Sequence, residues 1–376
     1  MYPNDVSADR AVSDLIADVG VGEVATESKP LQLRHWVEQF RTVLFRSEPW
    51  LWSTPTGRHT SRDTDTMMTE IESRLESAFE RARVEAQLHD VPPHVVYEVV
   101  VDGQRGVYKA STGPTGSAGV EGHVLQFLGN RTTVPVPEIL LAERDYFVAA
   151  WHADAPSLDG EFIADERWAR AAGRGLANLH EESAMHVDEY GSFRVDDGGR
   201  SSGTLTLCGH DDWHSAALEY VRSHRPVLER YGHSDMADLV VDVLEGLPDA
   251  FSGTGGPVCC HGWATPEHVS VVDGRVSCLV DFEHAIAAPG EFDVWRTVFP
   301  AFDSPDSAAA RAFLDGYESL RPLPGGFEKR RPLYGLLNGI YYFESLYVQD
   351  QHDAAQTAEK AASLRDSIER IASEIG

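Results

Sequence analysis

One stretch in the last third of the chain constrains the fold more than any other. A short apolar segment leads into a loop of small residues, a β-branched segment follows, and the pair Asp273-Gly274 precedes a second apolar segment that ends at Asp281 and Glu283. An Asp-Gly pair between two apolar runs is a strong signal for a two-residue hairpin turn. We therefore expect a hairpin within residues 258–283 that presents two acids at one edge.

The two acids at the end of this hairpin favour a metal-dependent reaction. Side chains two residues apart on a strand point to the same face, so Asp281 and Glu283 can flank one divalent cation while Phe282 packs on the opposite face. Phosphoryl transfer uses such an arrangement, because metal ions neutralise phosphate charge and positioning supplies most of the catalysis. The hairpin thus predicts a phosphoryl-transfer site.

This stretch resembles the catalytic and metal loops of the aminoglycoside phosphotransferase and choline kinase-like family. Members of the family read His-Gly-Asp, then four residues and Asn, and after a short hairpin Asp-x-Asp/Glu. His261 and Gly262 match the first motif, and Asp281 and Glu283 match the metal acids. The resemblance covers about residues 94–350 and implies an α+β, bilobal protein kinase-like fold. Its small N-terminal lobe would contain an antiparallel sheet, and its larger C-terminal lobe would be mainly helical.

Two positions of the catalytic-like loop depart from the family pattern. Trp263 stands at the position of the catalytic Asp, and His268 stands at the position of the Asn that helps to hold the metal. Trp has only an indole N–H donor and cannot accept a proton. Glu267 and His268 are the nearest possible substitutes for the missing acid, although imidazole is a poorer ligand for Mg²⁺ than an Asn oxygen. Asp293 and His261 match family residues that brace the loop.

The resemblance also implies a site for ATP or GTP with Mg²⁺. Lys109 ends a predicted strand at the position of the family's phosphate-pairing lysine, and Glu121, at the start of a predicted helix, resembles the glutamate that pairs with it. Adenine would bond to the backbone near Ala150 and His152. Residues 88–93 contain prolines where glycines would let backbone amides approach phosphate, which argues against nucleotide binding.

The remaining hydrophobic patterns divide the chain into four parts. These are a loosely ordered tail, a helical extension, the small lobe and the large helical lobe, at residues 1–30, 31–90, 91–150 and 151–376. Within the extension, apolar positions at helical spacing predict a helix from about Asp65 to Val84. In relatives the C-terminal helices form the acceptor site, so Tyr342 and Glu344 are candidates for lining it.

The charge balance bears on the partners and the environment. Sixty acidic against 32 basic residues give a formal net charge of −28, and only four of the basic residues are lysines. Such a surface stays hydrated in concentrated salt, which also screens its self-repulsion. We therefore expect a protein from the cytoplasm of a high-salt cell. Without a Lys/Arg-rich run or a long apolar stretch, we expect neither a nucleic acid nor a membrane as a partner.

Three hypotheses about function follow. The first is an ATP-dependent phosphotransferase that acts on a small-molecule hydroxyl and uses Glu267 or His268 as its base. The second is a pseudokinase that binds a nucleotide, a metabolite or a protein partner, with Trp263 filling the cleft. The third is a metal-assisted hydrolase built from the histidines and acids around the hairpin. The family pattern favours the first hypothesis, but the loss of the proton acceptor argues against efficient transfer. The acceptor and the oligomeric state stay open.

Overall fold

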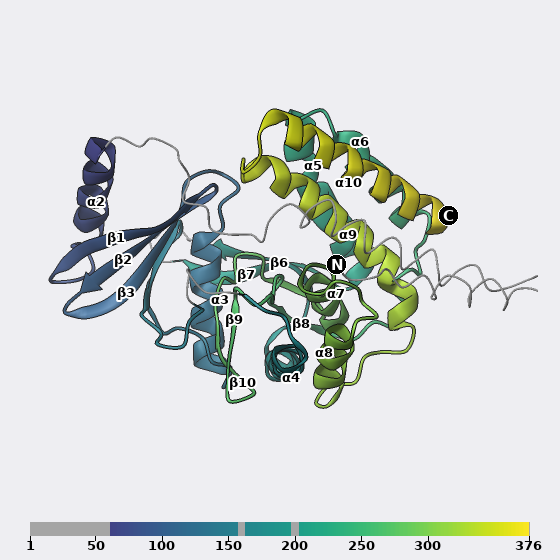
Figure 1. The fold of residues 1–376 in the computed structure, drawn as a ribbon, viewed down its shortest axis with the longest axis horizontal. Helices are drawn as coiled ribbons and strands as arrows, with labels where there is room; N and C mark the ends of the chain where they lie inside the picture. Colours follow the sequence, from purple (N-terminus) through teal and green to yellow (C-terminus); the bar gives the residue numbers. More distant parts are fainter. Residues whose placement is uncertain (1–60, 157–161, 197–202, 376) are drawn as a thin grey trace, which may run out of the picture.

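A computed structural model describes residues 61–156, 162–196 and 203–375 of the chain. The predicted tail, at residues 1–30, and the first half of the predicted extension lie outside the described residues. Figure 1 shows a sheet-rich N-terminal lobe at one end and a larger helical lobe at the other, with helix α3 between them. The predicted α+β architecture, with an antiparallel N-terminal sheet and a mainly helical C-terminal lobe, is therefore confirmed.

The N-terminal lobe is a five-stranded antiparallel sheet with the strand order β1-β2-β3-β5-β4. Its strands are β1 (Ala82–Val91), β2 (His94–Val101), β3 (Gln104–Ser111), β4 (Ile139–Ala142) and β5 (Tyr146–Ala150). Helix α2 (Ser61–Leu75) buries Ile71 and Leu75 against this sheet, and helix α3 (Ala118–Arg131) joins the core of the other lobe.

The predicted helix from Asp65 to Val84 was wrong in its second half. The helix ends at Leu75, and Ala82 begins strand β1, which pairs with β2 along its whole length. Small and apolar residues alternate with polar ones from Ala82 to His89, which is the period of a strand, and that signal was overlooked. The sheet therefore starts inside the segment that was predicted to be helical.

The C-terminal lobe surrounds a four-stranded sheet with the order β7-β6-β11-β8. Its strands, with those of the separate hairpin β9-β10, are β6 (Tyr190–Asp196), β7 (Thr204–His210), β8 (Pro257–Cys260), β9 (Val269–Val272), β10 (Arg275–Leu279) and β11 (Ile286–Pro289). Its helices are α4 (Glu166–Ser183), the short 3₁₀ helix η1 (Ala184–His186), α5 (Trp213–Arg230), α6 (Ser234–Glu245), α7 (Gly290–Ala301), α8 (Ala308–Glu318), α9 (Phe327–Val348) and α10 (Ala354–Ile375). Across the described ranges, no helix is long and apolar enough to cross a membrane.

The hairpin turn is confirmed, but the position of the acids on a strand is not. Asp273 and Gly274 have φ values of 51° and 73°, as a two-residue hairpin turn requires. Strand β10 ends at Leu279, which pairs with Val269 of β9 while its N–H bonds to Pro135 O on the other side. Asp281 lies beyond the strand with φ of 66°. Its direction is therefore set by this left-handed residue and not by strand alternation.

Candidate functional site

The loop between β8 and β9 carries the residues that resemble a catalytic loop, and helix α7 holds its backbone. Asp293, in the first turn of α7, accepts hydrogen bonds from the backbone N–H groups of His261 at 2.6 Å and Gly262 at 2.8 Å. Burial alone would raise the pKa of Asp293, but contacts with His180 and the loop hold it below its ordinary value. Asp293 thus lies where the resemblance implied a brace.

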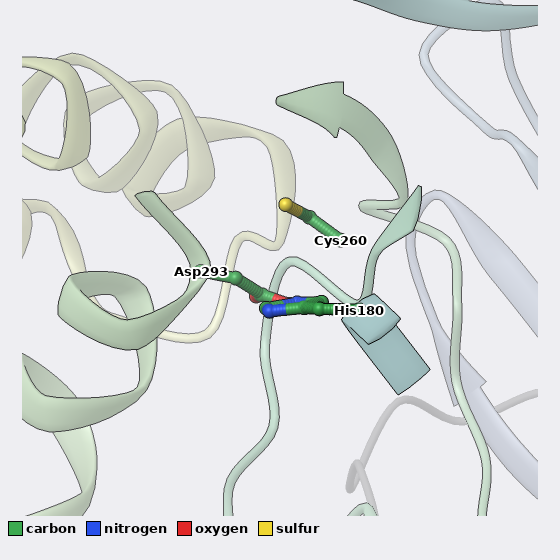
Figure 2. Close-up of side chains that lie close together, drawn as sticks. All are labelled: His180, Cys260 and Asp293. Carbon is green, nitrogen blue, oxygen red and sulfur yellow. The ribbon is translucent and has the colours of Figure 1, made fainter. Parts of the chain in front are cut away.

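A group of His180, Cys260 and Asp293 has atoms within 4.8 Å of one another, which makes it a candidate metal site. Figure 2 shows His180 and Asp293 side by side, with the Cys260 sulfur pointing away from them. His180 Nε2 contacts Asp293 Oδ2 at 3.0 Å, and its Nδ1 contacts the hydroxyl of Tyr317 at 2.8 Å. Burial keeps the Cys260 thiol protonated by raising its pKa well above the ordinary value. His180 and Asp293 therefore form a buried hydrogen-bond network with Tyr317, and the Cys260 thiol donates instead to Ala288 O at 3.6 Å.

Gly262 is hydrogen-bonded to two side chains of α7, those of Asp293 and Arg296. Its φ of 85° and the 2.2 Å that would separate an added Cβ from His284 O both require glycine. Its carbonyl accepts a hydrogen bond of 2.6 Å from Nε of Arg296, one turn after Asp293 on the same helix. The sequence interpretation did not single out Arg296. Its spacing of three residues from Asp293 places both on one helix face, and this was the available signal.

Trp263, which the resemblance aligns with the catalytic Asp, has a half-buried indole that packs against aromatic side chains. Its ring centroid lies 5.5 Å from that of Tyr341, 5.6 Å from that of Tyr342 and 6.5 Å from that of His284. We call these four residues the aromatic cluster. The cluster places an apolar wall and an indole donor where a carboxylate would be needed to accept a proton.

His261 points into the protein and not into the cleft. It is fully buried, its Nε2 donates to Val280 O at 2.9 Å, and its Nδ1 accepts from the N–H of Trp263 at 3.2 Å. Burial lowers the pKa of His261 to about 4, so the ring is neutral. With both nitrogens used, His261 holds the loop and does not join a metal centre, which argues against the hydrolase hypothesis.

His268 is held between two acceptors. Its Nδ1 lies 3.0 Å from Trp263 O, and its Nε2 lies 3.0 Å from Asp281 Oδ2. Burial would lower the pKa of His268, but Asp281 outweighs it and raises the pKa to about 9. The ring is then an imidazolium that donates from both nitrogens. In this arrangement it has no lone pair for a metal ion or for a substrate proton.

Lys109 lies at the centre of three carboxylates. Its Nζ is 2.6 Å from Asp281 Oδ1, 2.7 Å from Glu121 Oε2 and 2.8 Å from Glu283 Oε2. Burial would lower the pKa of Lys109, but the three carboxylates raise it well above its ordinary value. Burial also raises the pKa of Glu121 to about 7. The predicted lysine, its predicted glutamate partner and the predicted metal acids therefore meet in one cluster.

Further donors complete the contacts of Glu283. His94 Nδ1 lies 3.0 Å from its Oε2, His284 Nε2 lies 3.1 Å from its Oε1, and the hydroxyl of Ser117 donates to its backbone carbonyl at 2.8 Å. Together with Lys109 and His268, these groups place a side-chain nitrogen within 3.1 Å of every carboxylate oxygen of Asp281 and Glu283. The sequence interpretation did not assign His94, Ser117 or His284 to the site, because only the fold brings them there.

Some of the backbone groups expected to bind a nucleotide are hydrogen-bonded within the protein, and the two prolines have no backbone N–H. Pro92 and Pro93 form the turn between β1 and β2, and neither has an N–H that could bond to phosphate. The N–H of Ala150 donates to Glu138 O at 2.8 Å, and the Nδ1 of His152 accepts from the N–H of Asp154 at 3.2 Å. The roles of Ala150 and His152 toward adenine stay predictions.

The two residues expected to line the acceptor side lie on α9. Tyr342 belongs to the aromatic cluster and is 4% exposed. Glu344 Oε2 lies 2.6 Å from Nδ1 of His224 on α5.

Glu267 is half-buried in the turn before His268. Of the proposed substitutes for the missing acid, only Glu267 therefore keeps a side chain that is an acceptor by its chemistry.

Comparisons with known proteins agree with this geometry. The family model described as the phosphotransferase enzyme family matches residues 96–333. A thermostable mutant of aminoglycoside phosphotransferase APH(4)-Ia, solved in a ternary complex with ADP and hygromycin B, is 14% identical with a TM-score of 0.54, over 81% of this chain and 98% of that one. No curated protein matches.

Two further solved structures are similar over most of their length. A putative fructosamine-3-kinase from Haemophilus somnus 129PT is 15% identical with a TM-score of 0.55, over 81% of this chain and 98% of its own. Macrolide 2'-phosphotransferase type I is 16% identical with a TM-score of 0.52, over 81% of this chain and 97% of its own. At these identities the likeness describes the fold, and the chemistry has to be argued from the site.

Proposed function

Since the chain belongs to the phosphotransferase enzyme family, we propose that it is a pseudokinase of that family. It keeps the kinase-like core and has lost the group that takes the acceptor's proton. One observation supports this proposal: Trp263, which the resemblance aligns with the proton acceptor, packs its indole against Tyr341, Tyr342 and His284. A positioned general base contributes roughly 10²–10⁴-fold to a rate, and an indole contributes none of this.

The neighbouring residues do not replace the missing base. His268 contacts Asp281 and Trp263 O through its two nitrogens, so a proton from an acceptor hydroxyl would find no lone pair there. His261 is buried behind the loop. Glu267 is the remaining candidate, and a matched Glu267→Gln variant separates its chemistry from its size. The proposal predicts that this variant behaves as the wild type does.

The test is ATP turnover in molar KCl with Mg²⁺ and a panel of small-molecule alcohols. The wild type, Asp281→Ala and Glu267→Gln are compared at the same protein concentration. The proposal predicts that all three consume ATP at the same background rate. Turnover by the wild type that both substitutions remove would overturn it and would support the phosphotransferase hypothesis, with Glu267 as the base.

A second candidate function, nucleotide binding without transfer, is favoured by the contact of 2.7 Å between Lys109 and Glu121. Glu121, Asp281 and Glu283 offer carboxylate oxygens within 4.8 Å of one another, and such a donor set fits Mg²⁺. Asp281 and Glu283 would hold the ion, which when bound neutralises phosphate charge. Lys109 would then exchange a carboxylate contact for a phosphate.

Calorimetry decides whether nucleotide binding remains. ATP with Mg²⁺ is titrated into the wild type, Lys109→Ala and Asp281→Ala in molar KCl. Binding that both substitutions remove would support a nucleotide-binding pseudokinase. Heat that neither substitution changes would place any binding elsewhere. No binding at any salt concentration would leave a scaffold, and protein or metabolite partners would then be the thing to seek.

We also propose that the protein works in a high-salt cytoplasm. The support is the net charge of −28 together with the small number of lysines. Salt screens repulsion between exposed carboxylates, so the free energy of unfolding should rise with KCl concentration. Unfolding in dilute buffer, followed by circular dichroism, is the expected result. Full stability in dilute buffer would contradict this proposal.

A further inference from the structure

Two arginines are buried among the residues that the structure describes, and their partners differ. Arg330 is 6% exposed and donates two hydrogen bonds to the carboxylate of Glu291, at 2.6 and 2.7 Å. Arg296 is 2% exposed, and no carboxylate oxygen of the described residues lies within 4.0 Å of its nitrogens. Burying a charge without a counter-charge is costly. Arg296 therefore lacks the compensation that Arg330 has.

Neutral groups surround the Arg296 guanidinium. Its Nε donates to Gly262 O at 2.6 Å, and its Nη1 donates to the hydroxyl of Tyr220 at 2.8 Å. Its Cζ lies 4.0 Å from the ring centroid of Tyr341, an attractive cation–π contact. The carboxylate of Asp293 is directed to backbone N–H groups on the other side of Gly262. These contacts use some of the guanidinium donors, and the charge of Asp293 acts on Arg296 without a direct contact.

Asn338 supplies a second, independent observation at the same place. This residue is 1% exposed, and its Oδ1 lies 3.5 Å from Nη1 of Arg296. Its Nδ2 is buried and has no hydrogen-bond partner within the described part of the chain. Exchanging the two amide atoms would bring two N–H donors face to face, so the contact with Arg296 fixes this orientation. N–H donors of Asn338 without a partner in the described residues therefore lie beside a buried guanidinium that no described carboxylate contacts directly.

We infer that a small inorganic anion of the size of chloride binds beside the contact of Arg296 with Asn338, against Nδ2 of Asn338 and the guanidinium, where helices α7 and α9 meet. The anion supplies the counter-charge for the guanidinium and accepts the N–H groups of the amide. We infer a small ion because Asn338 and Arg296 are 1% and 2% exposed, which leaves little access from solvent for a larger one. Because Arg296 also holds the Gly262 carbonyl, the anion steadies the loop that carries Trp263. This inference does not rest on the proposed function.

The first test is thermal unfolding at constant potassium concentration and ionic strength. Chloride or bromide is replaced stepwise by gluconate or acetate, which carry the same charge and are larger. A ligand that binds only the folded state raises Tm with its concentration, and the expected rise is about 2 °C for each tenfold increase in halide. The same Tm in all four anions would overturn the inference. A rise with acetate and not with halide would overturn the assigned size.

Variants separate a specific site from general salt effects. Arg296→Met and Asn338→Leu should lose the halide-dependent part of the Tm shift. Arg222→Gln is the matched control, because it removes the same charge from an exposed arginine that pairs with Glu245. It should keep the full shift. A halide dependence that survives in Arg296→Met, or that disappears in Arg222→Gln, would contradict the inference.

Diffraction provides a measurement that does not depend on the folding of a variant. Wild-type crystals grown or soaked in bromide should show an anomalous peak within hydrogen-bonding distance of the Arg296 guanidinium. Crystals of Asn338→Leu under the same conditions should show a weaker peak or none. A bromide-soaked wild-type crystal without a peak at Arg296 would overturn the inference even if Arg296→Met does not fold.

Discussion

The loop that carries Trp263 has two sides, and they differ in how far their residues match the family pattern. On the side of α7, Asp293 and Arg296 hold the backbone at His261 and Gly262 through three hydrogen bonds of 2.6–2.8 Å. On the side of the cleft, the resemblance aligns Trp263 with the family's Asp and His268 with its Asn, and both ring nitrogens of His268 contact oxygen atoms of the protein. The comparison teaches that the contacts that hold a loop and the groups that do chemistry change independently, so a shared fold does not show a shared activity.

The largest expected effect tests the α7 side. Asp293→Ala removes the acceptor of two backbone N–H groups and the partner of His180, all of them buried. Breaking a buried, hydrogen-bonded charge costs about 3–5 kcal/mol, so we expect the free energy of unfolding to fall by this amount. Denaturant unfolding in molar KCl measures it. If Asp293→Ala lowered the free energy of unfolding no more than Trp263→Phe does on the cleft side, the two sides of the loop would not differ in their contribution to stability.

A second prediction concerns Gly262 and uses another glycine as its control. Gly262→Ala combines a positive φ with a contact to His284 O, whereas Gly274→Ala has φ of 73° and meets no atom within 4 Å. We expect a loss of about 2–4 kcal/mol for the first and about 1 kcal/mol for the second, because only the first adds overpacking to strain. Equal decreases in Tm for the two variants would show that the loop at Gly262 shifts to accommodate the added Cβ without a further loss of stability.

A third prediction follows from the neutral, buried His261. Its pKa falls to about 4 in the folded protein, from an ordinary value of 6.5. Between these values the unfolded chain binds the proton more tightly, so the free energy of unfolding decreases as the pH falls from 6.5 to 4. This residue contributes at most about 1.4 kcal/mol per pH unit. Denaturant unfolding measured at several pH values in this range should show that the free energy of unfolding depends less on pH in His261→Gln than in the wild type. The same pH dependence in both proteins would refute the assignment.

The smallest effect is expected on the cleft side. Trp263→Phe keeps an aromatic ring against Tyr341 and removes the indole N–H. We expect a loss of about 1 kcal/mol or less in the free energy of unfolding, because the ring is half-buried and its surroundings can adjust. Thermal unfolding measures this, with Tyr231→Phe as a control for the change of an exposed aromatic residue. A loss as large as that of Asp293→Ala would make Trp263 part of the structural core.

The sequence predicted those parts of the molecule that local patterns determine. Asp273-Gly274 predicted the hairpin that strands β9 and β10 form. The family resemblance of the segments around Lys109 and Glu121 predicted their pairing, and the two side chains lie 2.7 Å apart. Such signals lie within a few residues of the chain.

The missed parts depend on contacts between distant segments. Arg296, His94 and His284 reach the site only because the fold brings α7, β2 and the segment after β10 together. The predicted roles of His268 as base or metal ligand depended on a free ring nitrogen, and the acceptors on both nitrogens are set by tertiary structure. A residue type indicates what a side chain can do, and its neighbours decide what it does.

The central claim is that the loop backbone is still held in a shape suited to phosphoryl transfer. What the loop lacks is the two side chains of the family pattern, an Asp at position 263 and an Asn at position 268. The most direct test restores both of them in Trp263→Asp/His268→Asn and measures ATP hydrolysis with Mg²⁺ in molar KCl, since water can replace an unknown acceptor. The account predicts hydrolysis on the order of 10²-fold above the wild type, lost again when Asp281→Ala is added. A folded double variant that hydrolyses ATP no faster than the wild type would contradict the claim.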